Sequence, residues 1–437
     1  MRKFKLKSFR WWLVGISIFL LLAATGGILI HQDKFPLPLK ARITAPKDKY
    51  VAFLSEVYDT VKGNYWDKIT DEQLTNIFVL GTEKLTGQPL TAGPKNKAEL
   101  QKSLVSVLKE IKDNSKKKEF TVQLADMVLT NLQPFGRSRL YSRKEEISLK
   151  NTVENKNPTV DQYQIMGVEK SATEEEIQKI YQEKKAELKQ ENTPETQQEL
   201  AQLNKAYQVL ADQDARKTYD ESGVEPTMEY KLLRPDIFYL HLTKFSPTTI
   251  EELLRVTQKM DSKPESLNIL ILDLRDNVGG AIDGLPYFLG PFIGNDQYAY
   301  QFFHQGEKQD FKTKIGWLPS LIRYKKVIVL INENTQSSAE VMTAVLKKFN
   351  VGILVGTKTR GWGTVEKVFE LKQQIDESEK YSAFLVHSLT LREDGQPIEG
   401  GGVEPTIDIK APDWEKQLSA YFHYPALATA IKEVASQ

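Results

Sequence analysis

Ser337 and Ser338 are the residues of this sequence best placed for nucleophilic chemistry. They lie in the segment VIVLINENTQSSAEVMTAVLK (residues 327–347), where an apolar strand gives way to a polar loop and then to an amphipathic helix. A hydroxyl at a helix start lies beside unpartnered N–H groups and the positive end of the helix dipole, which suits a nucleophile whose attack creates an oxyanion. The alternative interpretation is that these serines only cap the helix.

A second candidate element is the glycine pair Gly279 and Gly280, which ends the sequence RDNVGG. It follows the apolar stretch LNILILDL (residues 267–274), which predicts a strand buried on both faces. Paired glycines at the carboxyl end of a strand let the backbone approach a ligand closely, and their N–H groups can point at a developing oxyanion. An ordinary turn is the alternative interpretation.

Composition narrows the chemistry further. The chain has 437 residues, enough for roughly three domains, and no cysteine, which excludes disulfides, thiolate zinc sites and a cysteine nucleophile. With 59 Lys and Arg against 58 Asp and Glu, the formal net charge is +1, which argues against nucleic acid as a partner. His304, His387 and His423 show no metal-ligand spacing, so we expect no metal and no other cofactor.

The N-terminal segment predicts a membrane anchor. Residues 1–10 contain five basic residues and no acid, and residues 11–30 carry no charge. Twenty helical residues span about 30 Å, the thickness of the bilayer core, and Trp11 and Trp12 suit its interface. We therefore expect a single-pass protein of the cell membrane, with residues 1–10 as a cytoplasmic tail and the bulk of the chain extracytoplasmic. A cleaved signal peptide is the alternative, but its apolar core is usually shorter, about 7–15 residues.

The rest of the chain divides by its hydrophobic pattern. Residues 31–48 indicate a linker, and residues 49–153 a helical region in which Thr70 begins a helix and residues 85–96 interrupt the helices. After residue 226 the pattern is typical of alternating strands and helices, which implies a mixed or parallel sheet. The expected elements of this part are a helix at 248–260 and strands at 237–242, 267–274, 326–331, 352–356 and 365–371.

Residues 159–224 resemble a J-domain. The resemblance rests on YxIMGV from Tyr163, LNKAYQVLAD (203–212) and RKTYDESG (216–223), and Thr173 with Glu176 forms a capping-box pattern. The family's His-Pro-Asp tripeptide, which serves to stimulate an Hsp70 ATPase, falls on the residues KQE at 189–191. This departure and the expected location argue against an Hsp70 partner, so we interpret the module as a packing or recognition element.

Four ordered motifs resemble peptidase family S41, the C-terminal processing or tail-specific serine peptidases: DLRDNVGG, NENTQSSAEV, LVGTKTRGWGTVEKVFEL and SLTLREDGQPIEGGGVEPTIDI. The resemblance implies an α/β (α+β) core with a mixed sheet over residues 226–412, followed by a helical tail at 413–437. It places the nucleophile on Ser337, three residues before Glu340, and implies oxyanion donors at the backbone N–H groups of Gly279, Gly280 and Ser338. The helical region 49–153 resembles the N-terminal region of the family.

The general base is where the sequence departs from the family. The resemblance implies a lysine 25 residues after the serine, within Gly-Lys-Gly, but the residue there is Trp362. An indole donates a hydrogen bond and has no basic lone pair, so it cannot accept the proton of the serine. Glu366 stands where the family has glutamine. In addition, the J-like module occupies the position of the usual PDZ domain, which captures the tail of a substrate by strand addition.

Three other residues are candidate substitutes for the base. Lys358 lies four residues before Trp362 and Lys367 five residues after it. The alternative interpretation of both is an ordinary surface lysine with a solvated side chain. His241 lies within a predicted strand. The alternative to a role as base is a structural histidine whose ring is hydrogen-bonded in the core or at the edge of the sheet.

The sequence therefore predicts a membrane-anchored S41-type peptidase homologue that retains Ser337, lacks its base, and acts on or binds extracytoplasmic polypeptides or a partner protein. Loss of the base should lower proteolysis by several powers of ten. An active peptidase with an unusual base and a non-catalytic membrane scaffold remain the alternatives.

Overall fold

The computed structural model describes residues 48–90, 93–191, 193–261 and 267–435. The predicted cytoplasmic tail, the transmembrane helix at 11–30 and all but the last residue of the linker lie outside these ranges. Among the described helices, none is both long and apolar enough to cross a membrane.

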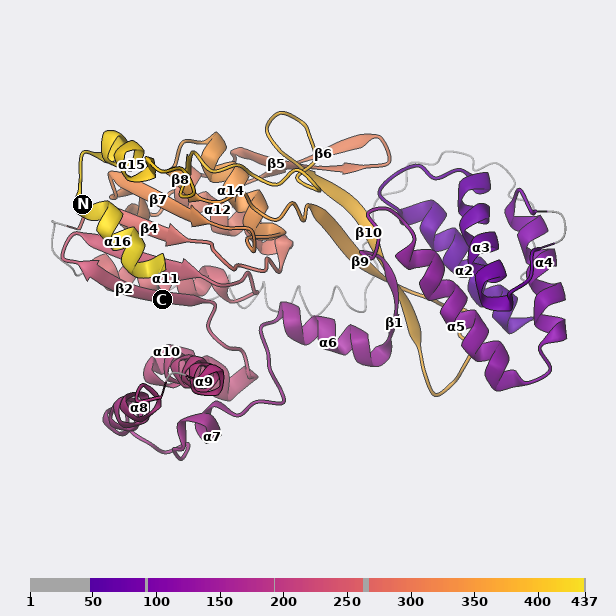
Figure 1. Cartoon of the computed structure of the whole chain (residues 1–437), viewed down its shortest axis with the longest axis horizontal. Helices are drawn as coiled ribbons and strands as arrows, with labels where there is room; N and C mark the ends of the chain where they lie inside the picture. The colour runs from indigo at the N-terminus through magenta and orange to yellow at the C-terminus, as the bar shows by residue number, and fades with distance from the viewer. Residues whose placement is uncertain (1–47, 91–92, 192, 262–266, 436–437) are drawn as a thin grey trace, which may run out of the picture. The chain divides into compact units, whose positions relative to one another are not determined.

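The N-terminal region is a helical bundle followed by one short strand (Figure 1). Its elements are α2 (Lys49–Asn64), α3 (Asp71–Thr86), α4 (Lys97–Glu110), α5 (Asn114–Thr130), β1 (Arg139–Ser142) and α6 (Arg143–Val153). The helix start predicted at Thr70 is confirmed, because the Thr70 hydroxyl accepts the N–H of Gln73 and the Gln73 side chain accepts the N–H of Thr70. The predicted interruption is also confirmed, since α3 ends at Thr86 and Asn96 caps α4.

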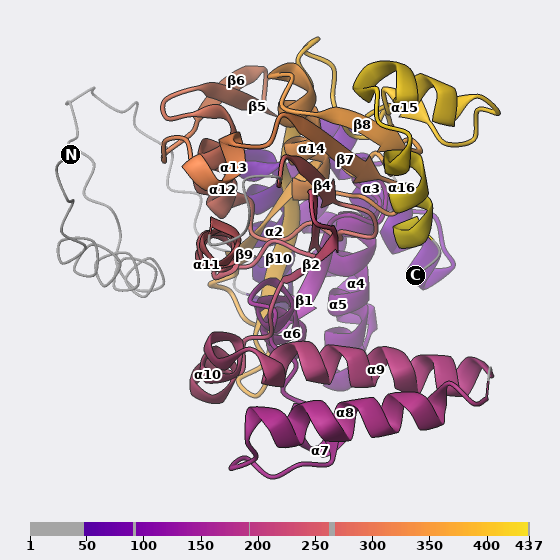
Figure 2. The same ribbon diagram turned by 90° about the vertical axis from the view of Figure 1, so that its left-hand side faces the viewer.

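The J-like module consists of α7 (Gln162–Met166), α8 (Glu174–Leu188), α9 (Pro194–Ala211) and α10 (Gln213–Ser222). Helices α8 and α9 lie side by side, as Figure 2 shows, and Tyr181 stacks on Tyr207 between them with ring centroids 3.9 Å apart. The predicted capping box of Thr173 and Glu176 is present at the start of α8. The module has its own apolar core, built around Met166 and Ile177.

The core contains a six-stranded mixed sheet in the order β11-β8-β7-β4-β3-β2, in which only the β2–β3 pair is antiparallel. Its strands are β2 (Met228–Arg234), β3 (Ile237–Leu242), β4 (Ile269–Asp273), β7 (Lys326–Ile331), β8 (Ile353–Gly356) and β11 (Ile407–Asp408). The prediction of a mixed or parallel sheet is thus confirmed as a mixed sheet. β4 is shorter than the predicted strand but, as predicted, buried along its whole length.

Helices cover both faces of this sheet (Figure 1). One apolar core joins one face to α11 (Thr249–Asp261), α12 (Leu285–Ile293) and α14 (Ser338–Lys348). A second core joins the opposite face to α15 (Trp414–Phe422) and α16 (Ala426–Ala435). Two short helical segments, η2 (Ile282–Gly284) and α13 (Pro319–Ile322), complete the core. This arrangement fixes the start of α14 at the carboxyl end of β7.

A second sheet links the core to the N-terminal helices. It has the order β1-β10-β5-β6, with β9 also paired to β10, and its remaining strands are β5 (Tyr298–His304), β6 (Glu307–Lys312), β9 (Thr364–Glu370) and β10 (Tyr381–Leu391). The long strand β10 pairs with β1, β5 and β9. Of these strands, only β9 was predicted from the sequence.

Candidate active site

Ser337 lies in the turn between β7 and α14, in a backbone conformation that is rare for residues other than glycine. Its φ is 58° and its ψ is −127°. Such strained conformations persist only where surrounding contacts hold them, and they concentrate at functional sites. Ser337 is half-buried and stands at the N-cap of α14, in a capping-box arrangement with Glu340, but its hydroxyl forms no regular capping hydrogen bond. The turn is thus compatible with both interpretations of this serine, as a helix cap and as a nucleophile.

The glycine turn after β4 packs directly against Ser337. A Cβ atom built on Gly279 would lie 2.6 Å from the Cβ and 3.0 Å from the Oγ of Ser337, and one built on Gly280 would lie 1.9 Å from the carbonyl oxygen of Phe245. Both glycines also have positive φ, 82° and 135°. Only residues without a side chain fit these two positions, so the glycines allow the turn to approach the serine.

The three backbone N–H groups predicted as oxyanion donors differ in their hydrogen bonding. The N–H of Gly279 donates to Oδ1 of buried Asn277 at 2.9 Å. The N–H groups of Gly280 and Ser338 donate no hydrogen bond within the described part of the chain. The Ser338 hydroxyl donates to the carbonyl of Gly280 at 3.0 Å, and this bond ties the start of α14 to the glycine turn.

The buried carboxylate of Glu340 joins the nucleophile turn to the loop that contains Trp362. Oε2 accepts the N–H of Ser337 at 3.0 Å and the N–H of Trp362 at 2.7 Å. Oε1 accepts the N–H of Gly361 at 2.7 Å and the hydroxyl of Thr359 at 2.6 Å. Burial raises the pKa of Glu340, and the four hydrogen bonds oppose this rise. In addition, the N–H of Ser337 donates to the carbonyl of Trp362 at 3.1 Å.

The side chain of Trp362 is held by a residue from the N-terminal region. The guanidinium carbon of Arg137 lies 3.5 Å from the centroid of the indole, and that of Arg360 lies 5.2 Å from it. Arg137 also forms an ion pair with Glu399 at 3.1 Å, and Glu399 accepts the N–H of Gly363 at 2.8 Å. Both members of the ion pair are largely buried, and desolvation lowers the pKa of Arg137. The face of the indole is thus covered by the cation of Arg137, which cannot act as a general base.

None of the three alternative bases contacts Ser337 within the described ranges. Lys358 is half exposed and forms an ion pair with Glu404 at 2.9 Å, and Lys367 is exposed on β9. His241 points toward Glu229, at 3.6 Å, and toward the carbonyl of Arg275, at 3.3 Å.

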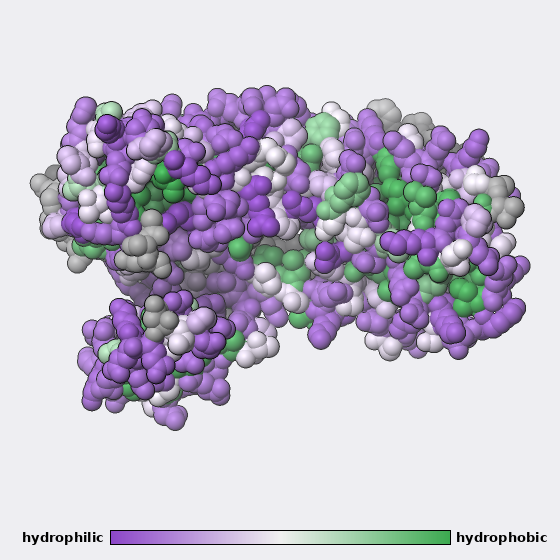
Figure 3. Space-filling model, in the orientation of Figure 1, coloured by the Kyte–Doolittle hydropathy of each residue, from purple (hydrophilic) through white to green (hydrophobic). Residues whose placement is uncertain are grey.

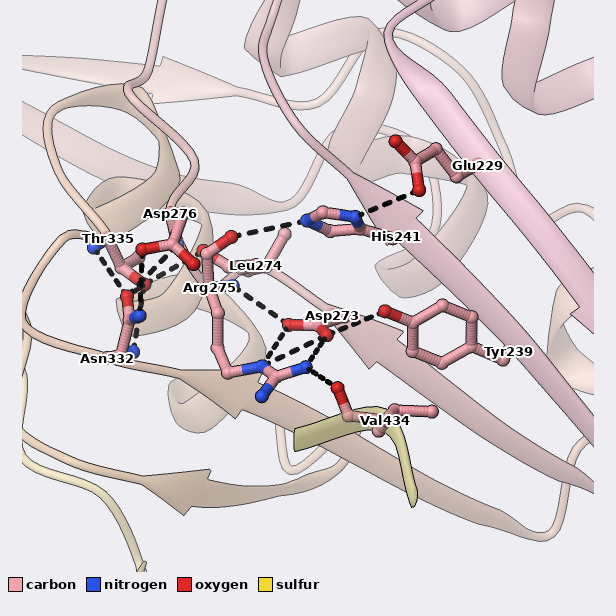
Figure 4. A network of polar contacts seen from close by, with 10 residues as sticks. All are labelled: Glu229, Tyr239, His241, Asp273, Leu274, Arg275, Asp276, Asn332, Thr335 and Val434. Carbon is pink, nitrogen blue, oxygen red and sulfur yellow. Dashed lines mark hydrogen bonds and ion pairs between the residues drawn. The ribbon is translucent and has the colours of Figure 1, made fainter. Parts of the chain in front are cut away.

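His241 belongs to a polar network at the carboxyl ends of β3 and β4 (Figure 4). Burial alone would lower its pKa, but the hydrogen bond to Glu229 and the nearby carboxylate of Asp273 raise it. Asp273 is fully buried and accepts hydrogen bonds from Tyr239 and Arg275. These partners account for His241 as a hydrogen-bonded histidine.

The sequence did not point to Arg137, Glu399 or Asn277. Arg137 reaches the site only because β1 pairs with β10, and Glu399 only because its turn packs on Gly363. Asn277 lies within the glycine motif itself. Asn side chains often accept a hydrogen bond from the backbone N–H two residues later, which here is that of Gly279, so this contact could have been expected from the sequence. In the same described part of the chain, no group of three or more His, Cys, Asp or Glu residues is placed to hold a metal ion.

Comparisons with known proteins match two regions of the chain. The model of peptidase family S41 matches residues 236–409, and the DnaJ domain matches residues 161–220. The chain is 27% identical over 218 residues to a carboxy-terminal-processing protease of Bartonella bacilliformis, covering 46% of this chain and 48% of that protein. It is 29% identical over 178 residues to the carboxy-terminal processing protease CtpA of Bacillus subtilis, covering 40% and 36%.

These matches span about half, or less, of the length of the curated relatives. Among solved structures, the chain is similar to a photosystem II D1 C-terminal processing protease, with a TM-score of 0.49 and 14% identity, over 83% of this chain and 94% of that one. The sequence matches and the predicted motifs coincide in position: the chain contains a peptidase family S41 domain and a DnaJ domain.

Proposed function

We propose that this protein is an S41-type serine peptidase homologue that keeps its nucleophile but has lost efficient proteolysis, and that it binds polypeptides or regulates an active partner. The observation that carries the proposal is Trp362, at the position of the base lysine. Its indole is stacked under Arg137, and no described base contacts the hydroxyl of Ser337. Without a base, attack by serine should be slower by several powers of ten.

The remaining geometry suits recognition of a polypeptide. The N–H groups of Gly280 and Ser338 have no acceptor among the described residues and can donate to a carbonyl oxygen, and Ser337 lies against the same turn. A site that binds a peptide carbonyl without cleaving it would hold the chain in place. We further propose that the uncharged segment at 11–30 anchors the protein in the cell membrane, with the site on the extracytoplasmic side.

An active peptidase is the second candidate function. The strained backbone of Ser337 and the two available donors favour it, because both are features that promote attack and oxyanion stabilisation. It requires a base that the described residues do not place beside the hydroxyl.

The two candidates are separated by labelling and cleavage with the full chain. A serine-directed fluorophosphonate and an unfolded polypeptide substrate are incubated with the natural sequence, with Ser337→Ala and with Trp362→Lys. We expect no Ser337-dependent labelling or cleavage in the natural sequence, and cleavage in Trp362→Lys at least ~100-fold above the background of Ser337→Ala. The cations of Arg137 and Arg360 would lower the pKa of the new lysine and favour its neutral form.

The matched control is the double variant Ser337→Ala, Trp362→Lys, which should be inactive. Labelling or cleavage by the natural sequence that disappears in Ser337→Ala would instead establish the active peptidase. Retention of the unfolded polypeptide by inactive protein, measured by fluorescence anisotropy, would support the binding role.

A further inference from the structure

A cavity of about 990 Å³ lies between the J-like module and the core. Helices α8, α9 and the start of α10 line it on one side, and β2, β3 and the end of β4 line it on the other. Its volume is at the upper end of the range of about 300–1,000 Å³ that is usual for small-molecule sites. The polar network of Figure 4 forms part of its wall, through Glu229, His241 and Arg275.

The cavity runs along the free edge of β2. Four consecutive residues of this strand, 228–231, line it. Because side chains alternate between the two faces of a strand, four consecutive lining residues mean that the cavity touches the edge of the strand and not just one face. Among the strands that the structure describes, β2 is the last of its sheet and pairs with β3 alone.

The register shows which backbone groups face this edge. The N–H of Thr243 donates to the carbonyl of Thr227, so the backbone groups of Thr227 face β3. In an antiparallel pair, every second residue of a strand faces the same neighbour, so the backbone groups of Glu229 also face β3. The backbone groups of Met228 and Tyr230 therefore turn away from β3. Neither residue forms another backbone hydrogen bond within the described ranges. Unpaired edge groups of this kind are a template for an added strand.

The charge of the cavity selects the occupant. Its described lining contains six carboxylates, three Lys or Arg side chains and His241, so its formal charge is −3 with this histidine neutral and −2 with it protonated. Asp276 accepts hydrogen bonds from the amides of Asn332 and Asn334 and has no ion pair within the described ranges, and Glu174 is exposed at the start of α8. The negative charge is thus contributed from both walls, which favours a positively charged guest.

We infer that this cavity is a docking site for an extended, lysine- or arginine-bearing segment of a polypeptide partner, which adds to the edge of β2 between that strand and the J-like helices. The inference goes beyond the proposed function, because the site is separate from Ser337 and needs none of its chemistry. It gives the J-like module a role as one wall of a peptide-binding groove.

The test uses the full chain and three labelled ten-residue peptides: alternating lysine and valine, alternating glutamate and valine, and the lysine peptide with alternate backbone nitrogens methylated. We expect the lysine peptide to bind at least ~10-fold more tightly than the glutamate peptide, and N-methylation to abolish binding because it removes strand hydrogen bonds. Bound lysine peptide should slow amide hydrogen exchange in residues 228–232.

The charge is tested with Glu174→Lys and the matched control Glu175→Lys, two exposed neighbours of which only Glu174 lines the cavity. Glu174→Lys should weaken binding of the lysine peptide by about 3- to 10-fold, and Glu175→Lys by less than about 2-fold. The inference would be overturned if the lysine and glutamate peptides bound equally, or if the two variants had equal effects. It would also be overturned if the bound peptide slowed hydrogen exchange elsewhere but not in β2.

Discussion

Arg137 stacks on Trp362 from the segment that precedes β1, so a residue of the N-terminal region completes the candidate active site. The same guanidinium forms an ion pair with Glu399, and the two side chains are only 17% and 15% exposed. Glu399 in turn holds the N–H of Gly363. Removing the guanidinium would leave a largely buried carboxylate without its cation and an indole without its partner.

We therefore predict that Arg137→Ala lowers the free energy of unfolding by about 2–4 kcal/mol. Urea unfolding measures the loss, with Arg139→Ala, at an exposed neighbouring position, as the control. A double-mutant cycle with Glu399→Ala isolates the ion pair. An effect no larger than that of Arg139→Ala would mean that the stack and the ion pair contribute nothing to stability.

Sequence motifs located Ser337, the glycine pair and Trp362, because each is defined by neighbours within a few residues. They did not locate Arg137 or Glu399, because these reach the site only through sheet pairing and turn packing. They also did not indicate that the side chain of Asn277, two residues before Gly279, accepts the N–H of that glycine. Motifs specify which backbone turns form, but they do not specify which donors remain free.

At the scale of elements, the second sheet was the part least accessible to sequence reading. The hairpin of β5 and β6 was not predicted from the sequence. Its two-residue turn, Gln305 and Gly306, has positive φ at both positions, 49° and 91°. This conformation is the preferred one for tight hairpins, but it is usually encoded by Asn-Gly or Asp-Gly. Strand β10 was missed as well, because its residues are buried almost without alternation.

This sheet contains a stacked pair of histidines. The rings of His304 and His387 lie 4.2 Å apart and nearly parallel, and the carbonyl of His387 bonds to Nδ1 of His304. Desolvation, together with the charges of Lys367 and His304, lowers the pKa of His387 to about 4. In the unfolded chain the value is about 6.5.

Between about pH 7 and pH 4 the unfolded chain therefore takes up a proton at His387 that the folded chain does not. This uptake favours unfolding, so the contribution of His387 to stability falls as the pH falls. We predict that His387→Gln makes the melting temperature less sensitive to pH over the range from 7 to 4.5. His423→Asn, outside this sheet, is the control and should keep the natural slope; an unchanged slope in His387→Gln would contradict the prediction.

At the scale of the whole described chain, the two helical regions relate to the core in different ways. The J-like helices have a separate apolar core. The helices α2–α5 instead share theirs with β10 and the segment before it, through Leu371, Ile375, Tyr381 and Leu385. The N-terminal helices are therefore part of the same folding unit as the sheet that leads to Trp362.

We predict that Leu385→Ala, at a fully buried position on β10, lowers the free energy of unfolding by about 2–5 kcal/mol. It should also speed hydrogen exchange in α2 and α5 while leaving α8 and α9 unchanged, because only the former share an apolar core with β10. Leu80→Ala, at a position 58% exposed on α3, is the matched control. Figure 3 shows other apolar surface over this helical region. Unchanged exchange in α2 would contradict a shared core.

The main chain of Trp362 is fixed independently of its side chain. Its N–H donates to Glu340 and its carbonyl accepts from Ser337, so a different residue at this position would be presented from the same two anchored atoms. Position 362 is therefore a suitable site for laboratory evolution. A library of lysine, histidine and acidic residues there samples different general bases on one loop, and each member starts from the same main-chain position beside the same serine.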